Sequence, residues 1–73
     1  MGIKKIRPKR GFKFRIVAYD PSLREIDHWD LSDLDTALDG ARALIEDSKN
    51  SIAKIDIYDR HGVLIWRHYQ VKG

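Results

Sequence analysis

The stretch LSDLDTALDGARALIEDSKN, residues 31–50, carries the clearest periodicity in the chain and sets the expected fold. At about 100° per residue, its small and apolar side chains fall into one stripe, as in a helix that packs on a neighbouring layer. The stripe consists of Leu34, Ala37, Leu38, Ala41, Ile45 and Ser48, with Asp35, Asp39, Arg42, Glu46 and Asp47 opposite it and Gly40 off it. Because the stripe is mostly Ala and Leu, we expect the helix to sit close to a sheet.

The two ends of this helix are marked by capping residues. Ser32 is the expected N-cap, with Asp35 three residues later in a shortened capping box. Asn50 is expected to end the helix in a left-handed conformation, and Lys49 suits the negative end of the helix dipole.

Two strands are predicted before the helix. Residues 12–19, FKFRIVAY, alternate with a period of two, which is typical of a half-buried strand. Asp20 and Pro21 then supply a turn. A second strand is expected over residues 25–30, where the alternation is weaker.

A hairpin is predicted after the helix. Residues 53–58 alternate in polarity, and Gly62 supplies the positive φ that a short loop at residues 59–62 requires. A loop of two or four residues places Ile55 and Ile57 on the same face as Leu64 and Trp66, whereas a loop of three residues places Ile65 there instead. We prefer the first register, because it puts Trp66 in the core.

These elements predict an α+β fold in the order β-β-α-β-β: a four-stranded antiparallel sheet with one helix packed on one face. The single domain is expected over residues 11–73, after a flexible basic N-terminal arm, residues 1–10. No internal repeat is expected at the level of the sequence. A chain this short buries only about 60% of its unfolded surface. It has no cysteine for disulfides, so association with a second chain is the remaining form of support.

The pattern resembles small bacterial proteins of unknown function, of the kind common in rhizobia, that share a ββαββ layout. The resemblance covers residues 12–67 and is carried by FKFRI, LSDLDTALDGARALIED and IDIYDRHGVLIW. It implies a compact single domain. It implies no activity and no functional residue.

Composition and motifs argue against an enzyme. The chain has no Gly-rich phosphate loop, no Gly-x-Ser-x-Gly and no Cys–His pair, and His28, His61 and His68 lack metal-ligand spacing. We therefore expect no catalytic residue, no cofactor, no metal site and no small-molecule substrate. No apolar run approaches the roughly 18–20 residues of a membrane span, so we expect no membrane partner and a cytoplasmic location.

Charge is strongly polarised along the chain. Residues 1–19 hold seven basic and no acidic side chains, whereas residues 20–47 hold nine acidic side chains against two basic ones. The basic segment is either a solvated tail or a contact for nucleic acid, an acidic protein or lipid. The candidate nucleic-acid-binding residues are Lys4, Lys5, Arg7, Lys9, Arg10, Lys13 and Arg15.

One helix covers only one face of a sheet, so the other face should be open. The helix side is expected to carry Phe12, Phe14, Ile16, Ile55, Ile57, Leu64 and Trp66. The candidate interface on the open face consists of Val17, Tyr19, Tyr58, Val63, Ile65, Arg67 and Tyr69. An exposed patch of this kind predicts a partner.

We expect a small non-enzymatic interaction module that forms a homodimer through the open sheet face. The alternative is a protein that binds single-stranded RNA or DNA, with bases on the tyrosines and phosphates on the arm. The acidic surface of the helix argues against a helix that reads duplex DNA.

Overall fold

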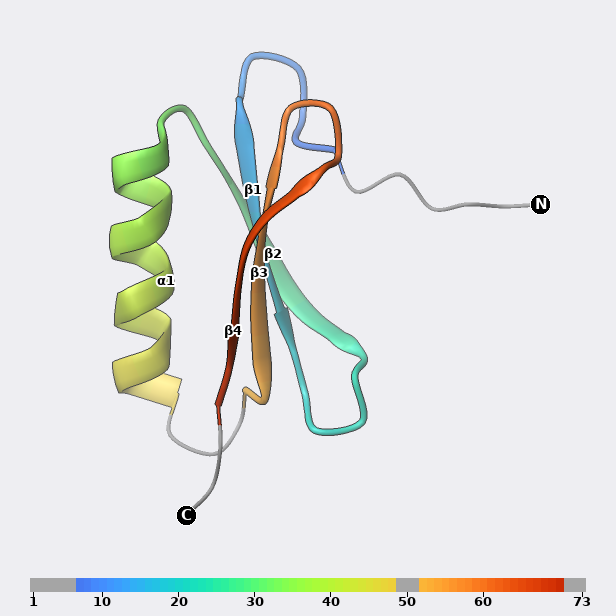
Figure 1. Cartoon of the computed structure of the whole chain (residues 1–73), viewed down its shortest axis with the longest axis vertical. Helices are drawn as coiled ribbons and strands as arrows, with labels where there is room; N and C mark the ends of the chain where they lie inside the picture. Colours follow the sequence, from blue (N-terminus) through green and yellow to red (C-terminus); the bar gives the residue numbers. More distant parts are fainter. Residues whose placement is uncertain (1–6, 49–51, 71–73) are drawn as a thin grey trace, which may run out of the picture.

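The computed structural model describes residues 7–48 and 52–70, which form four strands and one helix. The strands are β1 (Phe14–Tyr19), β2 (Glu25–Leu31), β3 (Lys54–Asp59) and β4 (Leu64–Tyr69), and the helix is α1 (Leu34–Ser48). The sheet has the order β2-β1-β3-β4, and each neighbouring pair is antiparallel. The helix α1 lies along one face of the sheet (Figure 1). The predicted α+β fold and element order are confirmed; Lys49 and Asn50 lie outside the described residues.

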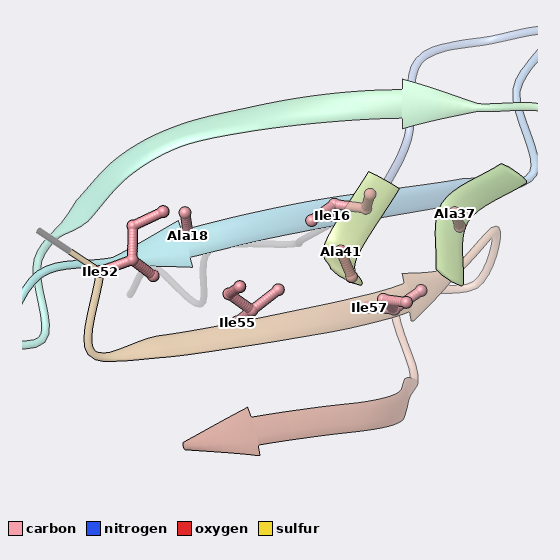
Figure 2. Packing of buried hydrophobic residues seen from close by; sticks show 7 residues of the cluster. All are labelled: Ile16, Ala18, Ala37, Ala41, Ile52, Ile55 and Ile57. Carbon is pink, nitrogen blue, oxygen red and sulfur yellow. The ribbon is translucent and has the colours of Figure 1, made fainter. Parts of the chain in front are cut away.

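The core lies between α1 and the two central strands, β1 and β3. The buried cluster consists of Ile16, Ala18, Ala37, Ala41, Ile52, Ile55 and Ile57 (Figure 2). Half-buried side chains surround it: Phe14, Leu31, Leu38, Leu44, Ile45 and Trp66. Because Ala37 and Ala41 face the sheet, the helix backbone approaches the strands closely, as the sequence predicted.

Two residues expected in the core are not there. Phe12 precedes β1 in a turn, where its N–H donates to the carbonyl of Lys9 (3.0 Å), and its side chain is 40% exposed. Leu34 is the first residue of α1 and is 39% exposed. The strand therefore begins two residues later than expected, and the apolar stripe of the helix begins at Ala37.

Gly40 faces the sheet, although the sequence placed it off the contact stripe. A Cβ at this position would lie 3.2 Å from Cδ1 of Ile16, which is tighter than ordinary contact. The missing side chain therefore lets α1 pass close over β1 at this point.

The N-cap of α1 is Asp33, not Ser32 as predicted. The N–H of Ala37 donates to the carbonyl of Asp33 (3.1 Å), which is the first helical bond. The Asp33 carboxylate accepts from the hydroxyl of Thr36 (2.6 Å) and from its N–H (3.4 Å). An N-cap side chain satisfies one of the free N–H groups of the first turn in this way.

Both hairpins close with the same turn. In the second one, the N–H of Gly62 donates to the carbonyl of Asp59 (3.0 Å), and Oδ1 of Asp59 accepts from the N–H groups of His61 (2.8 Å) and Val63 (3.0 Å). Asp20 makes the equivalent bonds with Leu23, Ser22 and Arg24 in the first hairpin, at 2.8, 2.9 and 2.9 Å. The predicted turn at Asp20 and the positive φ of Gly62 (82°) are confirmed.

The two hairpins repeat the same backbone geometry; this is a structural repeat and not one expected at the level of the sequence. Each position of the first hairpin corresponds to the position 39 residues later in the second hairpin, as Tyr19 does to Tyr58. The identities are Ile16 with Ile55, Tyr19 with Tyr58, Asp20 with Asp59 and Ile26 with Ile65. Each hairpin also has a bulge at the same place, after Ala18 in one and after Ile57 in the other. Since four identities are too sparse to stand out in a short sequence, the backbone geometry reveals the repeat.

The second hairpin has the three-residue loop that we did not prefer, yet Trp66 lies on the core side. Asp59 pairs with Val63 across residues 60–62. Tyr58 then faces Leu64, while Ile57 faces Trp66, so Ile65 is the bulged residue without a Cα partner. The extra residue of the bulge shifts the alternation of side chains along β4 by one position, which places Trp66 on the same side of the sheet as Ile57. Leu64, expected on the helix side, consequently shares the open face with Tyr58.

Candidate interaction surface

The centre of the open sheet face is a network around the carboxylate of Asp56. This side chain is 0% exposed, although the face has no second layer. Arg67 donates to both of its oxygens (2.7 and 3.0 Å), the hydroxyl of Tyr58 donates at 2.8 Å, and Nζ of Lys54 lies at 3.6 Å. Burial alone would raise the pKa of Asp56, but the hydrogen bonds from Arg67 and Tyr58 and the charge of Lys54 outweigh it and lower this pKa. The carboxylate is therefore held ionised.

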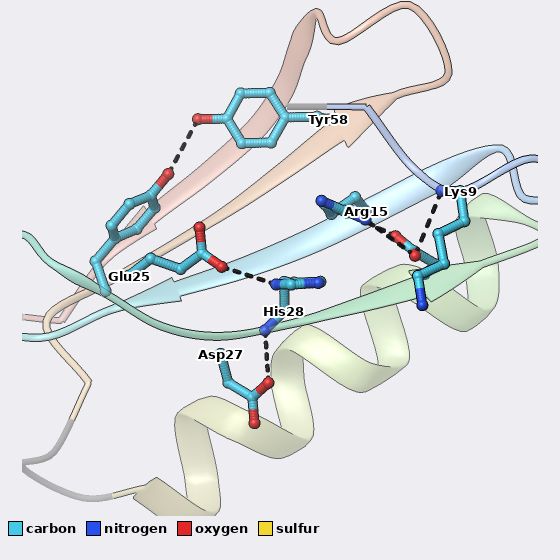
Figure 3. Close-up of polar contacts among 8 residues, drawn as sticks. Lys9, Arg15, Glu25, Asp27, His28 and Tyr58 are labelled. Atoms are coloured by element: carbon cyan, nitrogen blue, oxygen red, sulfur yellow. Dashed lines mark hydrogen bonds and ion pairs between the residues drawn. The ribbon is translucent and has the colours of Figure 1, made fainter. Parts of the chain in front are cut away.

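A second ion pair joins β1 to the edge strand β2. Arg15 donates to both oxygens of Asp30, at 2.7 and 3.1 Å, and the backbone N–H of Lys9 reaches the same carboxylate at 3.4 Å (Figure 3). The hydrogen bond from Arg15 lowers the pKa of Asp30. The guanidinium of Arg15, a candidate phosphate ligand in the sequence, is therefore occupied by a carboxylate.

Two tyrosines related by the internal repeat meet on this face. The hydroxyls of Tyr19 and Tyr58 are 3.5 Å apart (Figure 3), and Nζ of Lys54 lies 4.2 Å from the ring centroid of Tyr19. Burial, together with the bonds to Tyr19 and Asp56, raises the pKa of Tyr58 far above its usual value. The Tyr58 hydroxyl remains protonated and donates to Asp56.

The open face is therefore not the exposed apolar patch that the sequence predicted. Val17 points to this face, opposite Asp56, but only 1% of it is exposed. The longer side chains around Val17 form ion pairs and hydrogen bonds with one another and shield it from solvent. Of the candidate interface, Val63, Ile65, Arg67 and Tyr69 stay exposed, and the guanidinium of Arg67 lies 5.8 Å from the ring centroid of Tyr69.

A second surface lies at the end of the sheet where β3 turns into β4. The segment that leads into β1 reaches the same end (Figure 1). A hollow of about 410 Å³ opens there, lined by Lys13, Phe14, Asp59, Arg60, His61 and Ile65. We call the surface formed by Lys9, Arg10, Phe12, Lys13, Arg60, His61 and this hollow the basic hairpin end.

The cations of the basic hairpin end differ from those of the open face. Arg15, Lys54 and Arg67 each have a carboxylate within 4.0 Å. Within residues 7–48 and 52–70, none of the side chains of Lys9, Arg10, Lys13 and Arg60 has one. Asp59 lines the hollow, but its carboxylate accepts hydrogen bonds from the N–H groups of Val63 and His61 within the turn. These bonds lower the pKa of Asp59. Four cations without a carboxylate partner among the described residues therefore belong to the hairpin end.

The structure sorts the candidate residues into two groups. Arg7, Lys9, Arg10 and Lys13 are exposed, whereas Arg15 is paired; Lys4 and Lys5 lie outside the described residues. The exposed side chains of Val63 and Ile65 lie in and just after the turn that borders the hollow. Sequence reasoning missed Arg60 as a member of this surface. The available signal was its place in the loop after the third strand, because this loop lies beside the start of the first strand when the two strands pair antiparallel.

The three histidines form no common site. Nδ1 of His28 is 2.7 Å from a carboxylate oxygen of Glu25, and Nε2 of His61 accepts from Nε of Arg60 at 3.3 Å. In the described part of the chain, no group of three or more His, Cys, Asp or Glu side chains could hold a metal ion. No helix among the described residues has both the length and the apolar character needed to cross a membrane.

Comparison with known proteins adds no relative. No family model, no curated protein and no solved structure matches the chain. The resemblance to rhizobial ββαββ proteins stays a prediction.

Proposed function

We propose that this chain is a small non-enzymatic interaction module that binds single-stranded nucleic acid through the basic hairpin end and the N-terminal arm. The observation that carries the proposal is the difference in pairing between the two groups of cations. Lys13 and Arg60 line one hollow without a carboxylate within 4.0 Å in the described residues, and Lys9 and Arg10 precede them. Cations that are free of acidic partners release counterions when they meet phosphates, and this drives association.

Apolar side chains beside these cations favour single strands. Phe12 presents an exposed ring, and Phe14 and Ile65 contribute apolar surface to the hollow. An unpaired base can stack on an aromatic ring, with about 1–3 kcal/mol per base, and a duplex does not offer its bases in this way. The exposed carboxylates of Asp35, Asp39 and Glu46 on α1 repel phosphate, which disfavours insertion of the helix into a groove.

The site proposed here differs from the open face that the sequence favoured. Arg15 and Arg67 each make two hydrogen bonds to a carboxylate. A phosphate would have to displace Asp30 or Asp56 from them and leave that carboxylate without its partner. The cations of the hairpin end carry no such cost.

The test is a titration of labelled single-stranded RNA and DNA oligonucleotides with the whole chain at low and moderate salt. We expect binding at low salt that weakens as salt rises, and weaker binding for a duplex of the same length. The charge-reversed pair Lys13→Glu and Arg60→Glu should lose binding. The matched pair Arg24→Glu and Arg42→Glu changes the net charge equally away from this end and should keep most of it. Absence of binding at low salt, or equal losses in both pairs, would contradict the proposal.

Homodimerisation is the second candidate, and the edge strand β4 favours it. Val63, Leu64, Ile65 and Tyr69 are exposed in or next to this strand, which is the last of the sheet. Exposed apolar edges are sites of strand pairing with another chain. Association through the centre of the open face is less favourable, because it would desolvate the ion pairs of Asp30 and Asp56. Size-exclusion chromatography with light scattering tests the dimer, and a monomer at all accessible concentrations would exclude it.

A further inference from the structure

An apolar groove lies between α1 and the edge strand β2, on the face of the sheet opposite the ion pairs. Its volume is about 460 Å³, and its walls include Trp29 and Leu31 from β2 and Gly40, Ala43 and Leu44 from α1. Gly40 and Ala43 are small, so the helix does not cover Trp29, which is 37% exposed. A groove of this size suits an occupant with one or two apolar side chains.

The helix that walls the groove carries exposed acidic side chains. Asp39 lines the groove, and Asp35 and Glu46 are exposed on the same helix. None of these carboxylates has a basic side chain within 4.0 Å among the described residues. The occupant that complements this groove is therefore apolar and cationic.

The N-terminal segment of this chain has that chemistry. Residues 1–6, MGIKKI, combine two isoleucines with two lysines and contain no acidic residue. The described chain begins at Arg7, and two residues later the N–H of Lys9 donates to Asp30 (3.4 Å), which lies between Trp29 and Leu31 in β2. Six residues span up to about 20 Å when extended. Packed layers are about 10 Å apart, so the segment is long enough to pass around the β2 edge.

We propose that residues 1–6 dock in the groove of the same chain, with Ile3 and Ile6 against Trp29 and Leu44 and with Lys4 and Lys5 beside Asp39. The docking is intramolecular, and its short tether gives an effective concentration on the order of millimolar. A segment that binds only weakly as a free peptide is therefore able to occupy the groove when it is part of the chain. The groove and nucleic acid then compete for Lys4 and Lys5. This competition rests on the proposed function, whereas the docking itself does not.

The test uses Trp29 as a reporter, in a Trp66→Phe chain that leaves it as the single tryptophan. We expect deletion of residues 1–6 to shift Trp29 emission to longer wavelength, because the ring loses apolar cover. A free peptide of residues 1–7, added to the deleted chain, should reverse the shift saturably and less well at high salt. If Trp66→Phe impairs folding, the amide NMR shifts of Gly40, Ala43 and Leu44 in the otherwise unchanged chain give the same readout. Identical signals with and without residues 1–6, together with no effect of the peptide, would overturn the proposal.

Matched variants separate the two sides of the contact. The double variant Ile3→Ser and Ile6→Ser, and separately Asp39→Asn, should weaken the docking. In each case Trp29 emission should shift to longer wavelength, as it does after deletion of residues 1–6. Neither removes a cation, so both should leave oligonucleotide binding intact or strengthen it. The signal should also be unchanged on dilution. Dependence on protein concentration would assign the groove to the arm of a second copy and overturn intramolecular docking. Because the Trp29 measurement contains no nucleic acid, its outcome is independent of that of the oligonucleotide titration.

Discussion

Val17 and Asp56 face each other across the two central strands, and neither side chain is more than 1% exposed. They occupy equivalent positions of the internal repeat, at its centre, where β1 and β3 run antiparallel. One hairpin places an apolar side chain there. The other places a carboxylate, which can be buried because Arg67, Tyr58 and Lys54 pair with it. The centre of the open face is thus covered by its own side chains.

Replacing Asp56 should be costly. Asp56→Asn keeps the shape but removes the charge that pairs with Arg67 and Lys54, and we expect a loss of about 2–3 kcal/mol in the free energy of unfolding. Urea denaturation measures it. Glu46→Gln on the exposed side of α1 is the control and should change stability by less than about 0.5 kcal/mol. Equal effects of the two changes would show that the network adds nothing.

Stability should fall in acid. The pKa values of Asp30, Asp56 and Asp59 are lowered in the folded chain. A lowered carboxyl pKa contributes stability that is complete above the unfolded value, about 3.9, and is lost as pH falls through the folded value. We expect the free energy of unfolding to decrease as pH falls below about 4. The decrease should be smaller in Asp56→Asn; an identical pH dependence would contradict the assignment.

The two equivalent turns should respond oppositely to substitution. Leu23 has a φ of 65° and is exposed, whereas Gly62 has a φ of 82°. A left-handed conformation costs a non-glycine residue about 1–2 kcal/mol. Leu23→Gly should therefore stabilise the chain by up to about 1 kcal/mol after the entropy of glycine is subtracted, and Gly62→Ala should destabilise it by about 1–2 kcal/mol. Thermal unfolding measures both, and changes of the same sign would contradict the common turn geometry.

Gly40 allows the packing of α1 on β1 to be tested. Gly40→Ala gains about 1 kcal/mol of helix propensity but pushes against Cδ1 of Ile16, at 3.2 Å. We expect a net effect near zero in the otherwise unchanged chain. In an Ile16→Val background, which lacks that methyl group, the same change should stabilise by about 1 kcal/mol. Equal effects in the two backgrounds would show that the contact does not limit the approach.

The fold was predictable because its signals are local. The alternation around Ile16 and Ile55, the Ala-rich stripe of the helix and the turns at Asp20 and Gly62 each point to one element, and all of them are present. The bulge at Ile65 had no local signal. It follows from packing, which places Trp66 beside the core although the loop length alone would point it away.

The candidate site was less predictable, because charge pairing depends on register. Arg15 and Lys13 look alike in the sequence, two positions apart in one basic run. Asp30 comes opposite Arg15 when β1 and β2 pair, whereas Lys13 lies just before β1 and has no carboxylate within 4.0 Å among the described residues. Arg60 joins Lys13 only because the β3–β4 loop lies beside the start of β1. Sequence composition gives the number of basic residues, while pairing decides which of them are available.

The most direct test of the proposed interface is the salt dependence of binding to a single-stranded oligonucleotide. Each phosphate contact contributes about 0.7 to the slope of log affinity against log salt concentration. The double variant Lys13→Ala and Arg60→Ala should therefore have a slope shallower by about 1.4, and Arg24→Ala with Arg42→Ala should retain the original slope. If both pairs have the slope of the unchanged chain, the cations of the basic hairpin end do not contact phosphate and the proposed interface is wrong.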